Sequence, residues 1–381
     1  MDRLLTRETN VSDLLQFLTD SDPLPWADIV GWVPVSSTRE QRLARGQLAD
    51  LVLTAEDGRE AVLELKIGHT LSDAQRIAYE KYRDAEPEQR RLVLLALAPD
   101  GAAVAGADGW TVLRLSEVAA AWSVSANLAA QEVAALMAST LGAWDTLLDA
   151  VLLPGSNPVS APLDTLQSKF LARVVSREIA RRLPGDASTV VHQAESGVTS
   201  GGGLALVQAW TELQGDPLRC LVAEVRWKQS GQRLGVELRF GVDFWDKERE
   251  TRESRVAAWR LARAMSDAIT ADALRSHLAT HSPERVAALL PGHSSRGEPA
   301  AGWDDVVERG FASAKNPVGV PGNRRSFRCG FVGDGTRRFE EAVTLDTSTV
   351  TAGDLVDLIP ATLDHLVARL PANYEQFVWE R

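Results

Sequence analysis

The chain has 381 residues and a formal net charge of −11, with the apolar and charged fractions of an ordinary globular protein. The length allows two compact domains. The acidic balance counts against a protein that merely coats nucleic acid, and no apolar run is long enough to span a membrane. The N-terminus lacks the apolar segment of a secretory signal, and Cys220 and Cys329 are too few for a zinc cluster or a disulfide framework. We therefore expect a cytoplasmic protein without a membrane partner.

The first 151 residues alternate between helical and strand patterns. Helices are predicted at residues 11–18, 71–83, 116–122 and 128–151. Strands are predicted at residues 29–35, 47–53, 61–67, 92–98 and 110–113. Asp57-Gly58 is a turn signal that makes a hairpin of the second and third strands. The order of elements predicts an α/β domain with a mixed sheet over residues 1–151.

A segment rich in proline and glycine, residues 152–162, is the predicted domain boundary. Helices are predicted beyond it at residues 163–183, 249–290 and 353–370. Hairpins are predicted from residues 221–228 with 233–240 and from residues 325–330 with 337–345. Residues 163–381 are therefore expected to form an α+β domain.

Two acidic residues and a lysine in the predicted hairpin carry the functional argument. Asp50 lies within one strand, and Glu64 and Lys66 lie two residues apart in the next, so the last two share a face. Two carboxylates close together are costly unless a cation compensates them, and Mg²⁺ or Mn²⁺ prefers such oxygen ligands. The alternative is that Glu64 and Lys66 form an ion pair on an exposed strand.

These residues resemble the signature of the PD-(D/E)XK nucleases. Ala49-Asp50 stands for the first part, with alanine in place of proline, and Glu64-Leu65-Lys66 is the only acid-x-lysine triplet in the chain. Gln75 and Tyr79 match the Q-x-x-x-Y helix of RecB-like branches. The resemblance covers about residues 1–115 and implies a restriction-endonuclease-like mixed sheet flanked by helices.

The resemblance further implies a nuclease that hydrolyses DNA with Mg²⁺ or Mn²⁺, in bacterial defence or DNA processing. Asp50, Glu64 and the Leu65 carbonyl would bind the metal, and Lys66 would assist the attacking water. Gln75 and Tyr79 would brace the site, and Glu8 is a candidate further ligand. The C-terminal half would position DNA, mediate a homodimer or bind a partner protein of a defence system. An RNA nuclease and a catalytically inactive binding or sensor module are the alternatives.

Several basic residues are candidates for phosphate contacts, although a solvated surface explains them equally well. They are Arg39, Arg42 and Arg45 before the second strand, Arg76, Lys81 and Arg83 on the motif helix, and Arg324, Arg325, Arg328, Arg337 and Arg338 near the C-terminal hairpin. His277 and His281 have the i, i+4 spacing of half a zinc site, but an exposed pair is the better interpretation.

Overall fold

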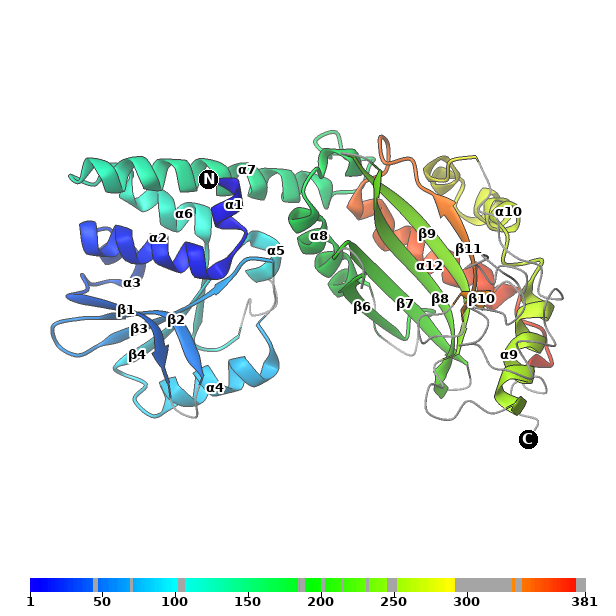
Figure 1. Cartoon of the computed structure of the whole chain (residues 1–381), viewed down its shortest axis with the longest axis horizontal. Helices are drawn as coiled ribbons and strands as arrows, with labels where there is room; N and C mark the ends of the chain where they lie inside the picture. The colour runs from blue at the N-terminus through cyan, green and yellow to red at the C-terminus, as the bar shows by residue number, and fades with distance from the viewer. Residues whose placement is uncertain are drawn as a thin grey trace, which may run out of the picture. The chain divides into compact units, whose positions relative to one another are not determined.

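The computed structural model describes residues 1–43, 47–68, 71–101, 107–183, 185, 189–199, 203–213, 216–230, 233–244, 252–291, 331–332 and 338–374. The chain has a mixed α/β fold and divides into two units, Met1–Ala150 and Val151–Arg381, each with its own sheet (Figure 1). The division falls beside residue 151, where the first domain was predicted to end. The segment that was predicted as a linker belongs to the second unit.

The first unit contains a five-stranded sheet in the order β1-β2-β3-β4-β5. Its strands are β1 (Ser36–Arg42), β2 (Leu48–Thr54), β3 (Glu60–Lys66), β4 (Arg90–Ala96) and β5 (Trp110–Arg114). Strands β1, β2 and β3 are antiparallel, whereas β3, β4 and β5 are parallel, so the sheet is mixed as predicted. The β2–β3 hairpin turns at Gly58, whose φ of 85° lies in the left-handed region that glycine adopts without strain.

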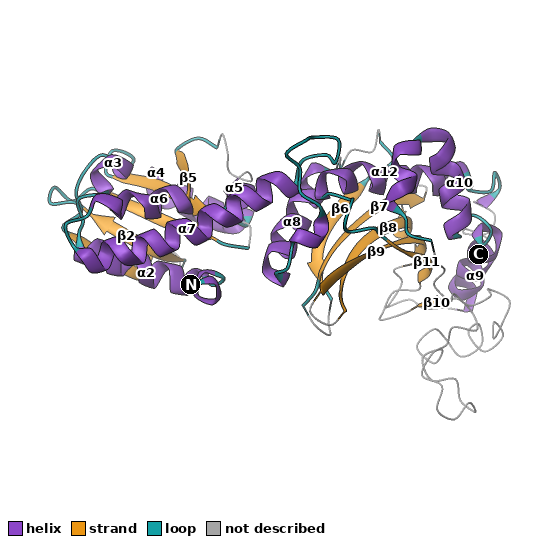
Figure 2. Ribbon diagram, turned by 90° about the horizontal axis from the view of Figure 1, so that it is seen from above, coloured by secondary structure: helices purple, strands orange, loops and turns teal. Residues whose placement is uncertain are grey.

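Helices cover both faces of this sheet (Figures 1 and 2). They are α1 (Asp2–Leu5), α2 (Glu8–Ser21), α3 (Trp26–Val30), α4 (Asp73–Asp84), α5 (Ala98–Gly101), α6 (Leu115–Ala120), the 3₁₀ turn η2 (Ala121–Val124) and α7 (Leu128–Val151). Helices α2, α6 and α7 lie on one side and α4 on the other. The α4 side is packed by Val52, Val62, Leu92 and Leu94 together with Tyr79 of α4. This layering buries the middle of β3 on both faces.

The first predicted strand, residues 29–35, is wrong. Residues Trp26–Val30 form helix α3, which ends at Gly31 in the left-handed conformation with φ 85°. Strand β1 begins only at Ser36 and runs through a polar stretch for which no strand was predicted. It is an outer strand whose side chains alternate between exposed and half-buried, so it needs no apolar run.

The second unit contains a six-stranded antiparallel sheet in the order β10-β11-β9-β8-β7-β6. The strands are β6 (Gln193–Val198), β7 (Ala205–Leu213), β8 (Asp216–Ser230), β9 (Arg233–Phe244), β10 (Phe331–Val332) and β11 (Arg338–Thr344). The helical elements are η3 (Leu163–Thr165), α8 (Lys169–Arg182), α9 (Arg252–Met265), α10 (Ala271–His281), η4 (Pro283–Ala288) and α12 (Ala352–Ala368). The predicted β8–β9 hairpin is confirmed. The second predicted strand of the other hairpin, residues 337–345, is confirmed as β11, whereas its first predicted strand, residues 325–330, lies outside the described residues.

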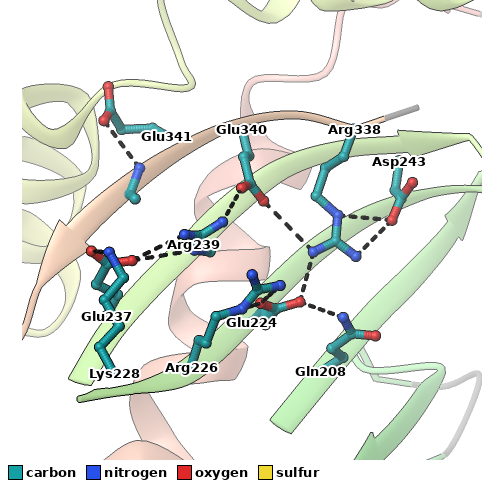
Figure 3. Close-up of polar contacts among 11 residues, drawn as sticks. Gln208, Glu224, Arg226, Lys228, Glu237, Arg239, Asp243, Arg338, Glu340 and Glu341 are labelled. Carbon is teal, nitrogen blue, oxygen red and sulfur yellow. Dashed lines mark hydrogen bonds and ion pairs between the residues drawn. The ribbon is translucent and has the colours of Figure 1, made fainter. Parts of the chain in front are cut away.

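Helices α8 and α12 pack on one face of this sheet, and the opposite face carries a buried network of charges (Figure 3). Arg338 of β11 is at its centre. Its guanidinium lies 2.7 Å from a Glu224 oxygen, 2.7 Å from an Asp243 oxygen and 3.6 Å from a Glu340 oxygen. Arg226 also pairs with Glu224 at 2.5 Å. The network joins β8, β9 and β11 across the sheet.

The expected basic patch on the C-terminal hairpin is therefore wrong for Arg338, which is buried among carboxylates rather than exposed to a phosphate. The Arg338 side chain is buried on the charged face of the sheet, where a guanidinium without a partner would strongly destabilise the fold. The other four arginines of that predicted patch, at positions 324, 325, 328 and 337, lie outside the described residues.

Three histidines of α10 and α12 lie together in the second unit. The rings of His277 and His281 stack with their centroids 4.3 Å apart, and His277 lies 5.1 Å from His365. His365 is fully buried, its Nε2 lies 2.8 Å from the Ala268 carbonyl oxygen, and its Nδ1 has no hydrogen-bond partner among the described residues. Burial lowers the pKa of His365, and nearby His277 and Arg369 lower it further. The hydrogen bond to the Ala268 carbonyl raises this pKa but does not outweigh them.

We expect the second unit to lose stability as the pH falls below about 6.5, because His365 binds its proton more weakly in the folded than in the unfolded chain. The loss begins at the unfolded pKa and ends at the lower folded pKa. Calorimetry at pH 7.5 and 5.5 measures it, and His365→Gln should flatten the pH dependence. His281→Gln, which changes an exposed ring, is the control. Equal pH dependence in wild type and His365→Gln would contradict the assignment.

None of the described helices is both long and apolar enough to cross a membrane.

Candidate active site

The predicted acidic residues Asp50, Glu64 and Glu8 meet at the end of β3. The antiparallel β2–β3 ladder ends at the pair Leu51–Leu63, and beyond it the Leu65 N–H donates to the Asp50 carboxylate, which brings Asp50 beside the end of β3. Glu64 is 3% exposed and Lys66 is 5% exposed. Both therefore belong to the interior, which excludes the exposed ion pair on a strand surface that was the alternative.

Glu64 is held from two directions. One carboxylate oxygen lies 2.7 Å from the ammonium nitrogen of Lys66, two residues along the same strand. The other accepts a short hydrogen bond from the hydroxyl of Tyr79 in α4. The same hydroxyl lies 2.8 Å from the Leu48 carbonyl oxygen, and the Tyr79 ring packs edge-on against Trp110 with centroids 5.8 Å apart. These contacts orient the Glu64 carboxylate within the sheet.

Three carboxylates accept hydrogen bonds from backbone amides at the end of β3. Asp50 accepts from Leu65 N–H at 2.8 Å, Glu8 from Ile67 N–H at 3.0 Å and Asp100 from Gly68 N–H at 2.7 Å. Glu8 begins α2 and also lies 3.8 Å from the Lys66 ammonium. Acids from β2, α2 and α5 thus converge on one short stretch of backbone.

Burial and the repulsion of neighbouring carboxylates raise the pKa values of Asp50 and Glu64 and favour their protonated forms. Burial, and after it the Asp50 charge, raises the pKa of Glu64 to about 7, although Lys66 and Tyr79 oppose the shift. Burial also raises the pKa of Asp50, although the hydrogen bond from the Leu65 amide lowers it in part. Burial alone would lower the pKa of Lys66, but the Glu64 and Glu8 carboxylates outweigh it and raise that pKa, so Lys66 is an ammonium. The site therefore favours added positive charge.

The oxygen atoms at this position are ligands of the kind that a hard divalent cation prefers. Asp50 and Glu64 supply two carboxylates. Leu65 donates its N–H to Asp50, and since the N–H and C=O of one strand residue point to the same side, its carbonyl faces Asp50 too. Within the described part of the chain, no group of three or more His, Cys, Asp or Glu side chains has the arrangement of a metal site. The remaining ligands would have to be waters, as Mg²⁺ usually keeps several.

Tyr79 and Gln75, the two predicted bracing residues, have different environments. Tyr79 contacts Glu64 directly, but Gln75 closes the capping box at the start of α4: its amide oxygen accepts the Ser72 N–H at 3.2 Å. Among the described contacts, Gln75 makes none with Asp50 or Glu64. Its observed role is to start the helix that carries Tyr79.

Three of the predicted basic residues near the site form ion pairs with carboxylates. Arg76 pairs with Glu80 at 3.1 Å and Arg83 with Asp84 at 2.8 Å. Arg39 pairs with Asp13 of α2. Arg45 lies outside the described residues. These ion pairs favour the solvated-surface interpretation for Arg39, Arg76 and Arg83.

Asp100 was not among the predicted site residues. It follows β4 in α5, is 2% exposed, and holds the amide of Gly68, whose φ of 79° turns the chain out of β3. Its one signal in the sequence is an acid placed just beyond a strand that runs parallel to β3, because such strand ends meet at one edge of a sheet.

Comparisons with known proteins gave no match: no family model fits the chain, and neither a curated protein nor a solved structure is significantly similar to it.

Proposed function

We propose that the first unit is a restriction-endonuclease-like nuclease domain that hydrolyses phosphodiester bonds of DNA with Mg²⁺ or Mn²⁺. The observation that supports this most is the convergence of Asp50 with the buried pair Glu64–Lys66: Asp50 accepts the Leu65 N–H between them, and its charge acts on Glu64. A purely structural role would give little reason to bury two neighbouring acids whose pKa values are both raised.

Each residue has a distinct part in the proposed reaction. Asp50, Glu64 and the Leu65 carbonyl would hold the cation, which when bound polarises the phosphate and acidifies a water. Lys66 is positioned to stabilise negative charge on the phosphate oxygens as the water attacks. Tyr79 keeps the Glu64 carboxylate oriented, and Asp100 holds the backbone turn that ends β3. Neither of the last two needs to touch the substrate.

Cleavage of plasmid and of labelled single-stranded DNA by the full chain tests the proposal. We expect cleavage with Mg²⁺ or Mn²⁺, none with a chelator, and a loss of about 10²-fold or more in Asp50→Asn, because several kcal/mol of charge stabilisation depend on the metal. Asparagine keeps an oxygen acceptor for the Leu65 amide, so the fold is retained.

The matched control is Asp57→Asn, which changes an exposed acid in the turn of the same hairpin. Equal cleavage by wild type and Asp50→Asn would overturn the proposal. An RNA oligonucleotide of the same sequence, run alongside, decides between DNA and RNA.

One observation favours a second candidate, a catalytically inactive binding or sensor module. Asp50, Glu8 and Asp100 each accept a backbone amide, and Glu64 is bound by Lys66 and Tyr79. The acids are thus already satisfied without a cation. Calorimetric titration with Mn²⁺ separates the candidates, since a module of this kind would show no binding that depends on Asp50.

A further inference from the structure

The three parallel strands of the first unit end at the same level. The register pairs Lys66 of β3 with Ala96 of β4, and Ala96 in turn lies beside β4's other neighbour at Arg114 of β5. The chain leaves β4 into α5, whose first residue is Ala98, and leaves β5 into α6. The end of β3, which bears Lys66, therefore has the ends of two further strands beside it at one edge of the sheet.

Two buried aspartates connect these strand ends. Asp100 of α5 is 2% exposed and accepts the Gly68 N–H at 2.7 Å, which ties the end of β4 to the residues that follow β3. Asp145 of α7 is 4% exposed and accepts the Ala98 N–H at 3.3 Å and the Ser116 hydroxyl at 2.6 Å. It thus ties the start of α5 to the start of α6, directly after β5. Together these hydrogen bonds extend across all three strand ends.

The burial of these carboxylates indicates that their hydrogen bonds matter. A carboxylate that leaves water loses its hydration, which destabilises the fold unless hydrogen bonds compensate. Burial raises the pKa of Asp145, although the Ser116 hydroxyl and the Ala98 amide lower it in part. A buried network whose groups are satisfied rigidifies the elements that it joins. The two aspartates therefore fix α5 relative to the ends of β3 and β5.

Helix α5 also has no room to shift toward β5. Gly101 is its last residue and is buried. A Cβ at this position would lie 2.9 Å from Val112 Cγ1 and 3.8 Å from Ala96 Cβ, so only glycine fits without a displacement. The helix is thus held by hydrogen bonds at Ala98 and Asp100 and by close packing at Gly101.

The turn that Asp100 holds is adjacent to the proposed catalytic residues. Gly68 has a φ of 79°, and Ile67 before it donates its N–H to Glu8 at 3.0 Å. The same Glu8 carboxylate lies 3.8 Å from the Lys66 ammonium. A shift of the Ile67–Gly68 peptide would therefore disturb both Glu8 and Lys66.

We propose that Asp100 and Asp145 are positioning residues of the nuclease site: Asp100 fixes the turn after β3 directly, and Asp145 acts through α5. The inference rests on the proposed nuclease function and adds to it the residues that set the place of Lys66. Neither aspartate touches the substrate or the cation. Because a misplacement of about 1 Å can reduce a rate by about 10²-fold, both should act on kcat rather than on substrate binding.

Steady-state cleavage by the full chain tests the proposal. Asp100→Ala should lower kcat about 10²-fold and Asp145→Ala about tenfold, with KM and Mn²⁺ affinity unchanged because the proposed metal ligands are intact. Asp100→Asn keeps an oxygen acceptor for the Gly68 N–H and should restore most of kcat. Asp149→Ala is the matched control, since it removes an exposed acid one turn along α7 and should cleave as wild type. Equal rates in Asp145→Ala and Asp149→Ala would contradict the role of Asp145.

A steric variant covers the case in which the alanine variants unfold. Gly101→Ala removes no hydrogen bond but would push α5 away from Val112, so it should lower kcat. Val112→Ala removes the methyl groups in the way, and the double variant should recover kcat although Val112→Ala also removes apolar contacts. Such a recovery requires that the position of α5, rather than stability, sets the rate. A double variant no faster than Gly101→Ala would count against the proposal.

Amide hydrogen exchange separates this inference from the nuclease function. Asp100→Ala and Asp145→Ala should speed the exchange of the Ile67 amide about tenfold, while amides earlier in β3 keep their wild-type rates. Unchanged exchange at Ile67 in Asp100→Ala would overturn the positioning role and leave the nuclease function standing. Absence of metal-dependent cleavage in wild type would overturn the nuclease function, while the exchange rates still decide whether the two aspartates fix the end of β3.

Discussion

Lys66→Met should reduce DNA cleavage by about 10²–10³-fold, because it removes the ammonium that lies 2.7 Å from the Glu64 carboxylate. A second effect adds to the first. The Lys66 ammonium opposes the rise in the Glu64 pKa, so its loss should move that pKa above about 7 and leave Glu64 protonated at neutral pH. The variant should therefore bind Mn²⁺ more weakly as well.

The two effects can be separated by pH. Raising the pH from 7.5 to 9 should restore much of the Mn²⁺ affinity of Lys66→Met, because Glu64 then loses its proton, but should not restore kcat. Titration calorimetry and initial rates of cleavage measure the two quantities. Lys169→Met, in helix α8 of the second unit, is the control and should behave as wild type. Full activity of Lys66→Met at pH 7.5 would show that Lys66 has no part in the reaction.

Arg338→Met should destabilise the second unit by about 3–5 kcal/mol, because it leaves Glu224 and Asp243 buried without their shared guanidinium. Denaturant unfolding, followed by hydrogen exchange of amides in β8 and β9, localises the loss to this unit. Lys228→Met is the control on the same face. Its pair with Glu237 is 46% exposed on the lysine side, so it should cost about 1 kcal/mol or less.

The defect of Arg338→Met should shrink in acid. Burial alone would raise the pKa of Glu224, but Arg338 and Arg226 outweigh it and lower that pKa. In wild type this stabilisation is present above the unfolded pKa of about 4.5 and is lost as the pH falls through the lower folded value. The variant has less of it to lose, so the difference between the two proteins should be smaller at pH 4 than at pH 7. A difference that does not vary with pH would contradict a charge-based cause.

Local patterns in the sequence were sufficient where the chain's own neighbours set the structure. The period of two in Glu64 and Lys66 placed both on one face of β3, and Asp57-Gly58 specified the hairpin that brings Asp50 alongside. The i, i+4 spacing was a weaker guide. It correctly predicted that Tyr79 contacts Glu64. Gln75 instead forms the capping box of α4, because an amide at the start of a helix has no hydrogen-bond acceptor within the helix and a side chain must supply one.

The sequence by itself determined the α/β succession of the first unit and the sharing of one strand face by Glu64 and Lys66, because turns and residue periods act over a few neighbouring positions. Only the tertiary structure decided that the polar residues Ser36–Arg42 form an outer strand, that Asp100 reaches the end of β3, and that Arg338 is buried in a network. Each of these depends on partners far along the chain. Polar residues can form a strand or enter an interior when such partners supply their hydrogen bonds and opposite charges, and a local pattern contains no record of them.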